Sequence, residues 1–412
     1  MLDFIFKKFL PFGLARTLSL AGIPLLQFLI AGFCSKEEAG RFYLLSAMAF
    51  IASQIADLGI SRAMPVIYAD SDEKMHSCIS EINILRWLSG ILFGCLFLVV
   101  NRLGETTWNW HESGLLLLFF CSGRVILLGN QGYCHARQQY GMLLRGAFVH
   151  IVAAATFIGC CAAAGKFGST AALAGLAVGV WAELVALDRP AAHPFKFTDF
   201  HWSEAFRVIW PYASVGAYTA VYNRIESVVA GKFLDPADLG IFGTLDSAFK
   251  LCIWPSYVSS QTLYPAVRDA IESKNTVQFM KHARQHFIAS GLICLLAMIV
   301  SLIYWYVGFT HDMRITAAAA FLWVSLWISV PNAFMIPLYY SFRFEKAFAN
   351  ITFYAMLLRC LVAPLLAAGF GYVGLCSTHA FVSIIVLLIF WLKLRPAVRD
   401  FLKQTAPVES NG

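Results

Sequence analysis

Long apolar segments alternate with short polar segments along almost the whole chain. Four of the apolar segments contain no Asp, Glu, Lys or Arg: residues 146–165, 285–310, 315–342 and 360–392. A helix needs about 20 apolar residues to cross the hydrocarbon core of a bilayer. The last segment is long enough for two such helices, and Gly369, Gly371 and Gly374 offer a place for the break.

The whole pattern predicts twelve transmembrane helices. We expect them near residues 9–34, 40–64, 83–101, 113–135, 143–165, 168–187, 205–231, 240–264, 285–309, 315–341, 347–369 and 373–393. An outer-membrane barrel is excluded, because its strands would alternate apolar and polar residues over short segments. The apolar segments here are long and continuous.

Composition supports a membrane protein and excludes a soluble enzyme. Apolar residues make up 59% of the 412 residues and charged residues only 13%, whereas charged residues are about 25% of a soluble domain. The fold class is therefore an all-α polytopic membrane protein. The 11 cysteines form no Cys-x-x-Cys pair. We interpret them as small apolar residues, so no metal site and no cofactor is expected.

The basic residues predict the orientation of the chain. With both termini in the cytoplasm, the inner loops and inner helix ends hold 20 Lys and Arg, whereas the outer loops hold six. An excess of basic residues on the cytoplasmic side is typical of helical membrane proteins. We therefore expect both termini to be cytoplasmic. The net charge of +7 follows from this topology and does not indicate a nucleic-acid partner.

A polar segment that contains Pro190 and Pro194 lies near the middle of the chain. We expect it to separate two halves. These are an N-terminal six-helix lobe at 1–190, a cytoplasmic linker at 191–203, a C-terminal six-helix lobe at 204–396 and a cytoplasmic tail at 397–412.

An internal repeat supports this division. Ala31-Gly32 and Ala230-Gly231 each end an apolar helix, and the motifs Gly40-Arg41-Phe42 and Gly240-Ile241-Phe242 follow them. The Ala-Gly pairs are 199 residues apart and the Gly-x-Phe motifs 200, so we expect a one-residue insertion between the halves. Transporters built from two repeats often bind their substrate between them.

Nine charged residues fall inside the predicted helices, where a charge costs at least about 2.5–3.5 kcal/mol. They are Arg16, Asp57, Arg124, Glu183, Arg224, Glu226, Asp246, Lys250 and Arg359. A charge at this depth persists only if it faces protein or a wet cavity. Arg124 lies near the middle of its helix, and Gln131 and His135 follow on the same face, which favours a cavity-facing position. Arg359 is similarly deep, and we expect it to face the cavity as well.

Three further cations have a competing structural interpretation. Arg224 follows alanines at 213, 217 and 220, a stripe that suits either a groove or close helix packing with the arginine reaching outward. Asp246 and Lys250 are four residues apart, so they form either a structural ion pair or an anion site that Asp246 tunes. Arg16 lies near the inner end of the first helix, close enough to the surface to reach it.

The acidic residues and His379 are assigned less directly. Asp57 continues a polar face with Ser46 and Ser53, and it either binds a coupling proton or cation or pairs with an arginine. Glu183 and Glu226 lie nearer to helix ends, so we expect both to be solvated. We expect His379 to be hydrogen bonded between packed helices.

Arginines inside a membrane favour an anionic substrate, because the guanidinium stays charged and binds phosphate through two parallel hydrogen bonds. The candidate substrate-binding residues are Arg124, Arg359, Arg224, Lys250 and Arg16. Asp57 and Asp246 are candidates for ion coupling or for an ion pair in the cavity. No catalytic residue is expected.

The first 60 residues carry a resemblance to a known family. The segments are Gln27-Phe28-Leu29-Ile30-Ala31-Gly32, then Ser35-Lys36-Glu37-Glu38-Ala39-Gly40-Arg41-Phe42-Tyr43, then Ala56-Asp57-Leu58-Gly59-Ile60-Ser61. They resemble the first two helices of bacterial polysaccharide (O-antigen) flippases, in the multidrug/oligosaccharidyl-lipid/polysaccharide exporter superfamily. The resemblance implies a bacterial inner-membrane protein of two six-helix lobes in a V, with a cavity between them.

The same resemblance implies a substrate and partners. The substrate would be undecaprenyl-pyrophosphate-linked oligosaccharide, moved from the cytoplasmic to the periplasmic leaflet by alternating access that is coupled to an ion gradient. The partners would be this lipid-linked oligosaccharide, membrane lipids and a polysaccharide polymerase. The chain contains no nucleotide-binding motif, so direct use of ATP is not expected.

Three alternatives to a flippase fit the sequence less well. A multidrug antiporter on the same fold would need buried acids for cationic drugs, yet this interior has deep arginines. A glycosyl polymerase or ligase would need a large outer loop, and the outer loops here are short. A major-facilitator sugar transporter usually carries a Gly-rich, Arg-rich loop between its second and third helices, and residues 65–82 contain nothing similar.

Overall fold

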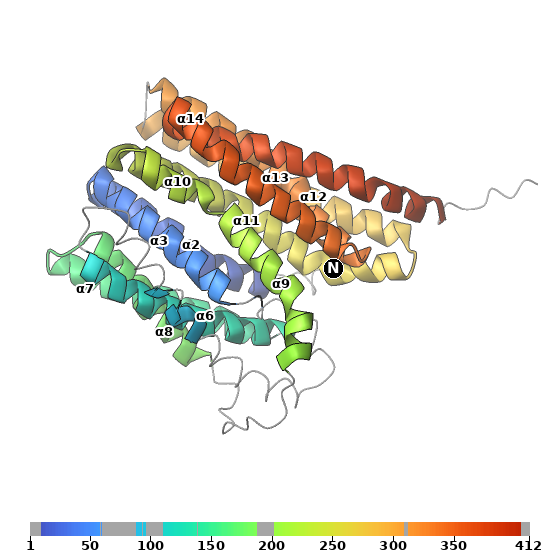
Figure 1. Ribbon diagram of the computed structural model, residues 1–412, viewed down its shortest axis with the longest axis horizontal. Helices are drawn as coiled ribbons and strands as arrows, with labels where there is room; N and C mark the ends of the chain where they lie inside the picture. Colours follow the sequence, from blue (N-terminus) through green and yellow to red (C-terminus); the bar gives the residue numbers. More distant parts are fainter. Residues whose placement is uncertain are drawn as a thin grey trace, which may run out of the picture. The chain divides into compact units, whose positions relative to one another are not determined.

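The computed structural model describes residues 10–57, 59, 88–92, 94–95, 110–137, 139–187, 202–308 and 312–404 (Figure 1). Within these ranges the chain is helical and contains no strand. The expected third helix at 83–101 lies largely outside the described residues, and so does most of the expected linker at 191–203.

The first helices that the structure describes agree with the apolar pattern of the sequence. They are α2 (Leu10–Phe33), α3 (Lys36–Ala56), α6 (Trp110–Ala136), α7 (Tyr140–Ala163) and α8 (Ser169–Ala186). The later helices are α9 (Trp202–Tyr222), α10 (Ile225–Phe233), α11 (Pro236–Glu272), α12 (Thr276–Gly308), α13 (Met313–Ser341) and α14 (Glu345–Gln404). Among the described residues, six helices are long and apolar enough to cross a membrane. The chain is an all-α polytopic membrane protein.

Two helix breaks refine the predicted elements. The expected continuous helix at 205–231 is two helices, α9 and α10, and the chain leaves helical geometry at Arg224 (φ −135°, ψ −1°). The expected helices at 347–369 and 373–393 are the two arms of α14, which meet at Gly371. Gly371 has φ 59°, a left-handed conformation that glycine adopts without steric cost.

The chain divides into two compact units, Met1–Ser247 and Ala248–Gly412, and the boundary lies within α11. In the first unit α8 packs against α6, α7, α3 and α2. In the second unit α13 packs along α14. The buried hydroxyl of Tyr339 on α13 donates to the carbonyl of Phe390 on α14 at 3.0 Å, and the two rings lie edge to face.

The internal repeat is visible as two matching helix turns in the first unit, α2 to α3 and α10 to α11. Ser35 accepts a hydrogen bond from the Glu38 amide at 3.2 Å, and Asp235 accepts one from the Asp238 amide at 2.8 Å. These N-cap residues are 200 positions apart, and so are Gly40 and Gly240. The two turns therefore correspond at a constant spacing from the N-cap to the glycine, and no insertion falls between these two positions.

Gly40 and Gly240 explain why the Gly-x-Phe motif occurs twice. A Cβ atom on Gly40 would collide with the carbonyl of Pro236, and one on Gly240 with the carbonyl of Lys36. The two turns therefore contact each other through equivalent positions. Glycine is needed at both, because only a residue without a side chain lets the two backbones come so close.

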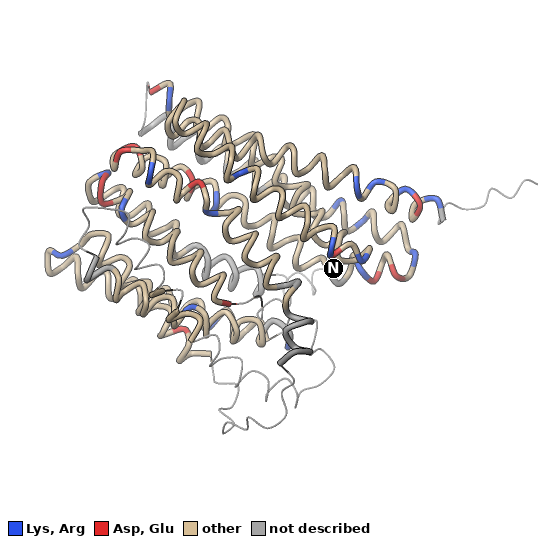
Figure 2. The backbone as a smooth tube through the Cα atoms, viewed as in Figure 1, with Lys and Arg blue, Asp and Glu red and all other residues tan. Residues whose placement is uncertain are grey.

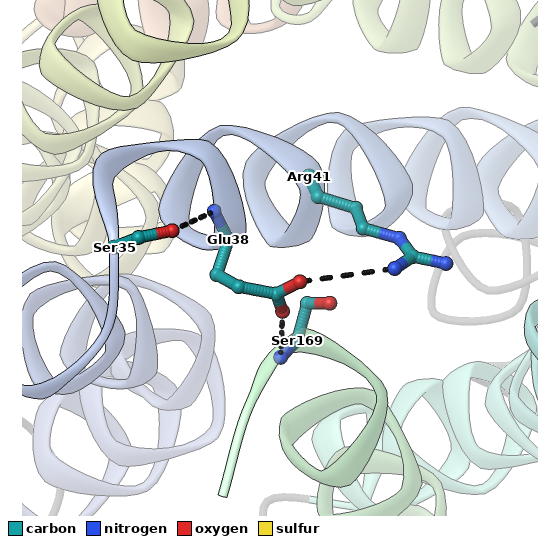
Figure 3. A network of polar contacts seen from close by, with 4 residues as sticks. All are labelled: Ser35, Glu38, Arg41 and Ser169. Carbon is teal, nitrogen blue, oxygen red and sulfur yellow. Dashed lines mark hydrogen bonds and ion pairs between the residues drawn. The ribbon is translucent and has the colours of Figure 1, made fainter. Parts of the chain in front are cut away.

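The acidic first turn of α3 contacts the start of α8 in the first unit (Figure 3). One carboxylate oxygen of Glu38 accepts a hydrogen bond from the Ser169 amide, in the first turn of α8, at 2.8 Å. The other lies 3.7 Å from Nη1 of Arg41. An acidic side chain satisfies amide groups that have no partner at a helix N-terminus. The motif that carries the family resemblance thus has a structural role at α8.

Candidate anion site

Charged residues lie mostly at the helix ends, and a few lie within the helices (Figure 2). Two arginines in the first unit are buried: Arg124, within α6, and Arg224, at the break between α9 and α10. Each has 6% of its surface exposed. Their surroundings decide whether they are structural ion pairs or sites for an anion.

Glu183 on α8 is hydrogen bonded to polar side chains of α6 and α7. The carboxylate is fully buried, and both of its oxygens accept hydrogen bonds. The amide nitrogen of Gln131 on α6 donates to Oε1 at 2.7 Å. Nδ1 of His150 on α7 donates to Oε2 at 2.9 Å, because the carboxylate is the acceptor of this pair. The expectation that Glu183 is solvated is therefore wrong, since three helices enclose it.

Arg124 lies within electrostatic reach of Glu183 without forming an ion pair with it. Within the ranges that the structure describes, no acceptor is at hydrogen-bond distance from the Arg124 guanidinium. None of its nitrogens is among the fully buried side-chain atoms that lack a partner in the described residues, so the guanidinium keeps some access to solvent. A guanidinium is a donor only, so what it lacks here is an acceptor, such as a water molecule or an anion.

Arg224 is also buried without a hydrogen-bond acceptor in the described part of the chain. Its guanidinium carbon lies 4.9 Å from the centre of the Phe50 ring on α3, a cation–π contact. The sequence left open whether Arg224 lines a groove or reaches outward to the membrane surface. The structure places it inside the first unit, held by an aromatic face that leaves its N–H groups free to donate.

The middle of α3 links the surroundings of the two arginines. Phe50 contacts Arg224, and the carbonyl of the preceding residue, Ala49, accepts a hydrogen bond from the thiol of Cys121 on α6 at 3.7 Å. Cys121 is one helical turn before Arg124, on the same side of α6. The same stretch of α3 therefore contacts Arg224 directly and α6 at Cys121, one turn before Arg124.

Asp246 has a partner that the sequence did not indicate. Its Oδ2 accepts a hydrogen bond from the hydroxyl of Tyr43 on α3 at 2.5 Å, and the same hydroxyl lies 2.7 Å from Oγ of Ser227 on α10. Asp246 and Lys250 are both buried. Glu226 is buried too, which contradicts the expectation that it is solvated.

The second unit contains a buried arginine in a different environment. Nη2 of Arg359 donates to Nδ1 of His379 at 3.2 Å, and the His379 ring packs against Phe249. Because an arginine can only donate, Nδ1 of His379 carries no proton. His379 is hydrogen bonded between packed helices, in agreement with the expectation for it.

The remaining candidates are less well defined. The side chains of Arg16 and His135 lie outside the described residues, although α2 and α6 include their backbone. Asp57 follows the last turn of α3 and is buried. The sequence did not suggest the bond between His150 and Glu183. The only sequence signal for this bond is a histidine in an apolar segment without Asp, Glu, Lys or Arg. In the structure, the absence of a side chain at Gly179 makes space for the His150 ring.

Comparison with solved structures identifies the fold. The chain is similar to a multidrug resistance MATE family transporter of the MOP superfamily in an outward-facing conformation, with a TM-score of 0.65 and 13% identity over 97% of this chain and 96% of that one. It is also similar to the lipid II flippase MurJ in an inward closed conformation, with a TM-score of 0.69 and 14% identity over 95% of this chain and 88% of that one.

A third similar structure is the eukaryotic MATE transporter AtDTX14, with a TM-score of 0.64 and 14% identity over 97% of this chain and 98% of that one. No family model matches the chain, and no curated protein matches its sequence. The chain therefore has the fold of the MATE transporters and of the flippase MurJ. The sequence identities to these structures are low. The comparison therefore defines the fold, and the substrate has to be inferred from the site.

Proposed function

We propose that this protein is a flippase for undecaprenyl-pyrophosphate-linked oligosaccharide, the repeat unit of an O-antigen or a related polysaccharide. It moves this lipid from the cytoplasmic to the periplasmic leaflet of the bacterial inner membrane by alternating access. The observation that supports this most is the pair of buried arginines, Arg124 and Arg224, which lack hydrogen-bond acceptors in the described part of the chain.

Two arginines suit a pyrophosphate better than they suit an organic cation. A guanidinium offers several N–H donors in a plane and matches phosphate oxygens through paired hydrogen bonds. An organic cation would be repelled by both side chains. The similarity to a lipid II flippase supports a lipid-linked substrate, because that protein combines the same fold with a flippase activity.

The other parts of the proposal follow the sequence. Arg359, Lys250 and Arg16 remain candidates for contacts with the substrate, and Asp57 and Asp246 for ion coupling. A polysaccharide polymerase would receive the flipped lipid. A glycosyl polymerase activity of the chain itself is not proposed, since the fold is that of transporters.

The test follows lipid-linked oligosaccharide in a bacterial strain that lacks the gene. Wild type, Arg124→Gln and Glu272→Gln are returned on a plasmid, and the leaflet that holds the lipid-linked oligosaccharide is determined by its accessibility in spheroplasts. Glu272 is the matched control, because it carries a charge like the site residues but forms an exposed ion pair with Arg268 on α11. All variants must be present in the membrane at equal amounts.

The proposal predicts that the lipid accumulates in the cytoplasmic leaflet without the gene. Wild type and Glu272→Gln restore surface polysaccharide, and Arg124→Gln does not. Normal surface polysaccharide without the gene, in a strain with no second flippase, would contradict the proposal. A multidrug antiporter would then be the better interpretation, given the similarity to MATE transporters.

A further inference from the structure

His150 and Glu183 form a buried pair with one open position for a proton. Nδ1 of His150 donates to Glu183. Nε2, on the other side of the ring, has no hydrogen-bond partner among the described residues. The ring packs against Gly22 of α2 and Gly179 of α8, and a Cβ atom on Gly179 would lie 2.9 Å from Nε2. A proton at this atom makes an imidazolium that is already paired with the carboxylate.

The positive charge of Arg124 balances the negative charge of Glu183 only while no anion is bound to Arg124. Arg124 is the cation that acts on the Glu183 carboxylate, and His150 and Gln131 contribute no charge when His150 is neutral. An anion that binds Arg124 adds negative charge close to a carboxylate that is already buried. Like charges at such a site disfavour each other strongly, and taking up a proton is the usual way in which the cost is relieved.

We propose that Arg124, Glu183 and His150 form an anion site in which binding of a phosphate-type anion to Arg124 is accompanied by uptake of one proton on the His150–Glu183 pair. The proton binds at Nε2 of His150, and the imidazolium then replaces Arg124 as the counter-ion of Glu183. No covalent bond changes. This inference deepens the proposed function, since it assigns a proton to the step in which the pyrophosphate is bound.

The groups that face the pair from each neighbouring helix are few. α6 contributes Arg124 and Gln131, and α7 contributes His150. The side chains of α2 described here, residues 22–33, include no titratable group. On α3, Glu38 contacts the first turn of α8, which is about 21 Å from Glu183 at the helical rise. Asp57 is the one acid of α3 that lies toward the same end as Glu183.

The experiment measures protons that accompany binding. Purified full-length protein in nanodiscs is titrated with undecaprenyl pyrophosphate and, separately, with inorganic pyrophosphate, by calorimetry at pH 7. Two buffers that differ in ionisation enthalpy are used, so that the difference in apparent enthalpy gives the number of protons exchanged. The proteins are wild type, Glu183→Gln, His150→Gln and the control Glu272→Gln.

Wild type and Glu272→Gln are expected to take up about one proton more per bound anion than Glu183→Gln or His150→Gln. Protons that the ligand itself exchanges cancel in this difference. Lowering the pH from 8 to 6 should raise the affinity of wild type more than it raises that of Glu183→Gln, because binding takes up a proton only in wild type. His150→Gln keeps a donor for Glu183, so it serves as the second variant if Glu183→Gln does not fold.

The results also separate this inference from the proposed function. Anion binding with equal proton uptake in wild type and both variants would overturn the inference and leave the flippase proposal standing. Proton-linked binding of inorganic pyrophosphate, in a protein that does not restore flipping in cells, would uphold the inference and contradict the flippase. Absence of anion binding by folded wild type would overturn both.

Discussion

The buried arginines of the two compact units differ in what their N–H groups contact. In the first unit, Arg124 and Arg224 have no hydrogen-bond acceptor among the described residues. In the second unit, Arg359 donates to a histidine ring. A buried cation with unused donors is costly unless a ligand or water completes its hydrogen bonds. We therefore expect the anion to bind at Arg124 and Arg224, whereas Arg359 has a side-chain partner of its own in His379.

The buried histidines show a related contrast. His150 in the first unit has a carboxylate on one nitrogen and an open position at the other. His286 in the second unit is bonded on both sides, 3.2 Å from Oγ of Ser259 and 3.1 Å from the carbonyl of Val330. Nδ1 of His379 accepts from Arg359. Of these three histidines, His150 is the one that is hydrogen bonded to a carboxylate.

Replacing both open arginines should have the largest effect. The double variant Arg124→Gln, Arg224→Gln removes both cations and should reduce flipping by at least about 100-fold, since charged hydrogen bonds contribute about 1.5–3 kcal/mol each. Surface polysaccharide in the deletion strain measures this. Flipping at more than a tenth of the wild-type rate would show that the substrate anion binds elsewhere.

A change that keeps the charge of Arg124 tests the geometry of the site. Arg124→Lys retains a cation and loses the planar fork that binds two phosphate oxygens together. Affinity for undecaprenyl pyrophosphate should fall about 10-fold, which corresponds to roughly 1.4 kcal/mol. Titration of the purified variant measures it. Unchanged affinity would mean that Arg124 acts only through its charge.

The contrast between the units predicts a different effect for Arg359. Arg359→Gln breaks the bond to His379 and should lower the free energy of unfolding by about 1–3 kcal/mol. Affinity for undecaprenyl pyrophosphate should change less than in Arg124→Lys. Thermal unfolding of the purified protein, followed by circular dichroism, measures the stability. A variant as stable as wild type but unable to bind the lipid would move the anion site toward the second unit.

The smallest expected effect is at Phe50. Phe50→Leu keeps an apolar side chain on α3 and removes the ring that holds Arg224. A cation–π contact contributes about 0.5–2 kcal/mol. Because Arg224 is still present, only part of this energy is lost on binding, and affinity should fall about 2- to 5-fold. Leu45, which is fully buried on α3, provides a control as Leu45→Met. An equal loss in both variants would attribute the effect to packing of α3.

The sequence was most informative about the helices and least informative about contacts between them. Apolar segments define the helices, because length and polarity suffice to recognise a span. The break at Arg224 was missed, since no Gly or Pro marks it. Glu183 was placed in solvent from its position near a helix end. Its burial depends on Gln131 and His150, which come from two other helices and have no fixed spacing to it.

The candidate site shows the same limit at single residues. The sequence predicts that Arg124 lies deep and faces inward, because Gln131 continues the polar face of α6 that begins at Arg124. The sequence could not show that Gln131 is bonded to Glu183 while Arg124 lacks an acceptor. For Arg224, the stripe of alanines was compatible with two opposite positions. Only the contact with Phe50 decides between them.

Binding of undecaprenyl pyrophosphate, compared with its uncharged alcohol undecaprenol, tests the central claim most directly. Both lipids have the same tail, so the difference in affinity reports the anion alone. Wild type should bind the pyrophosphate about 100-fold more tightly, and Arg124→Gln should lose most of this preference while Glu272→Gln keeps it. If folded Arg124→Gln prefers the pyrophosphate as strongly as wild type does, Arg124 does not bind the substrate anion and the account is contradicted.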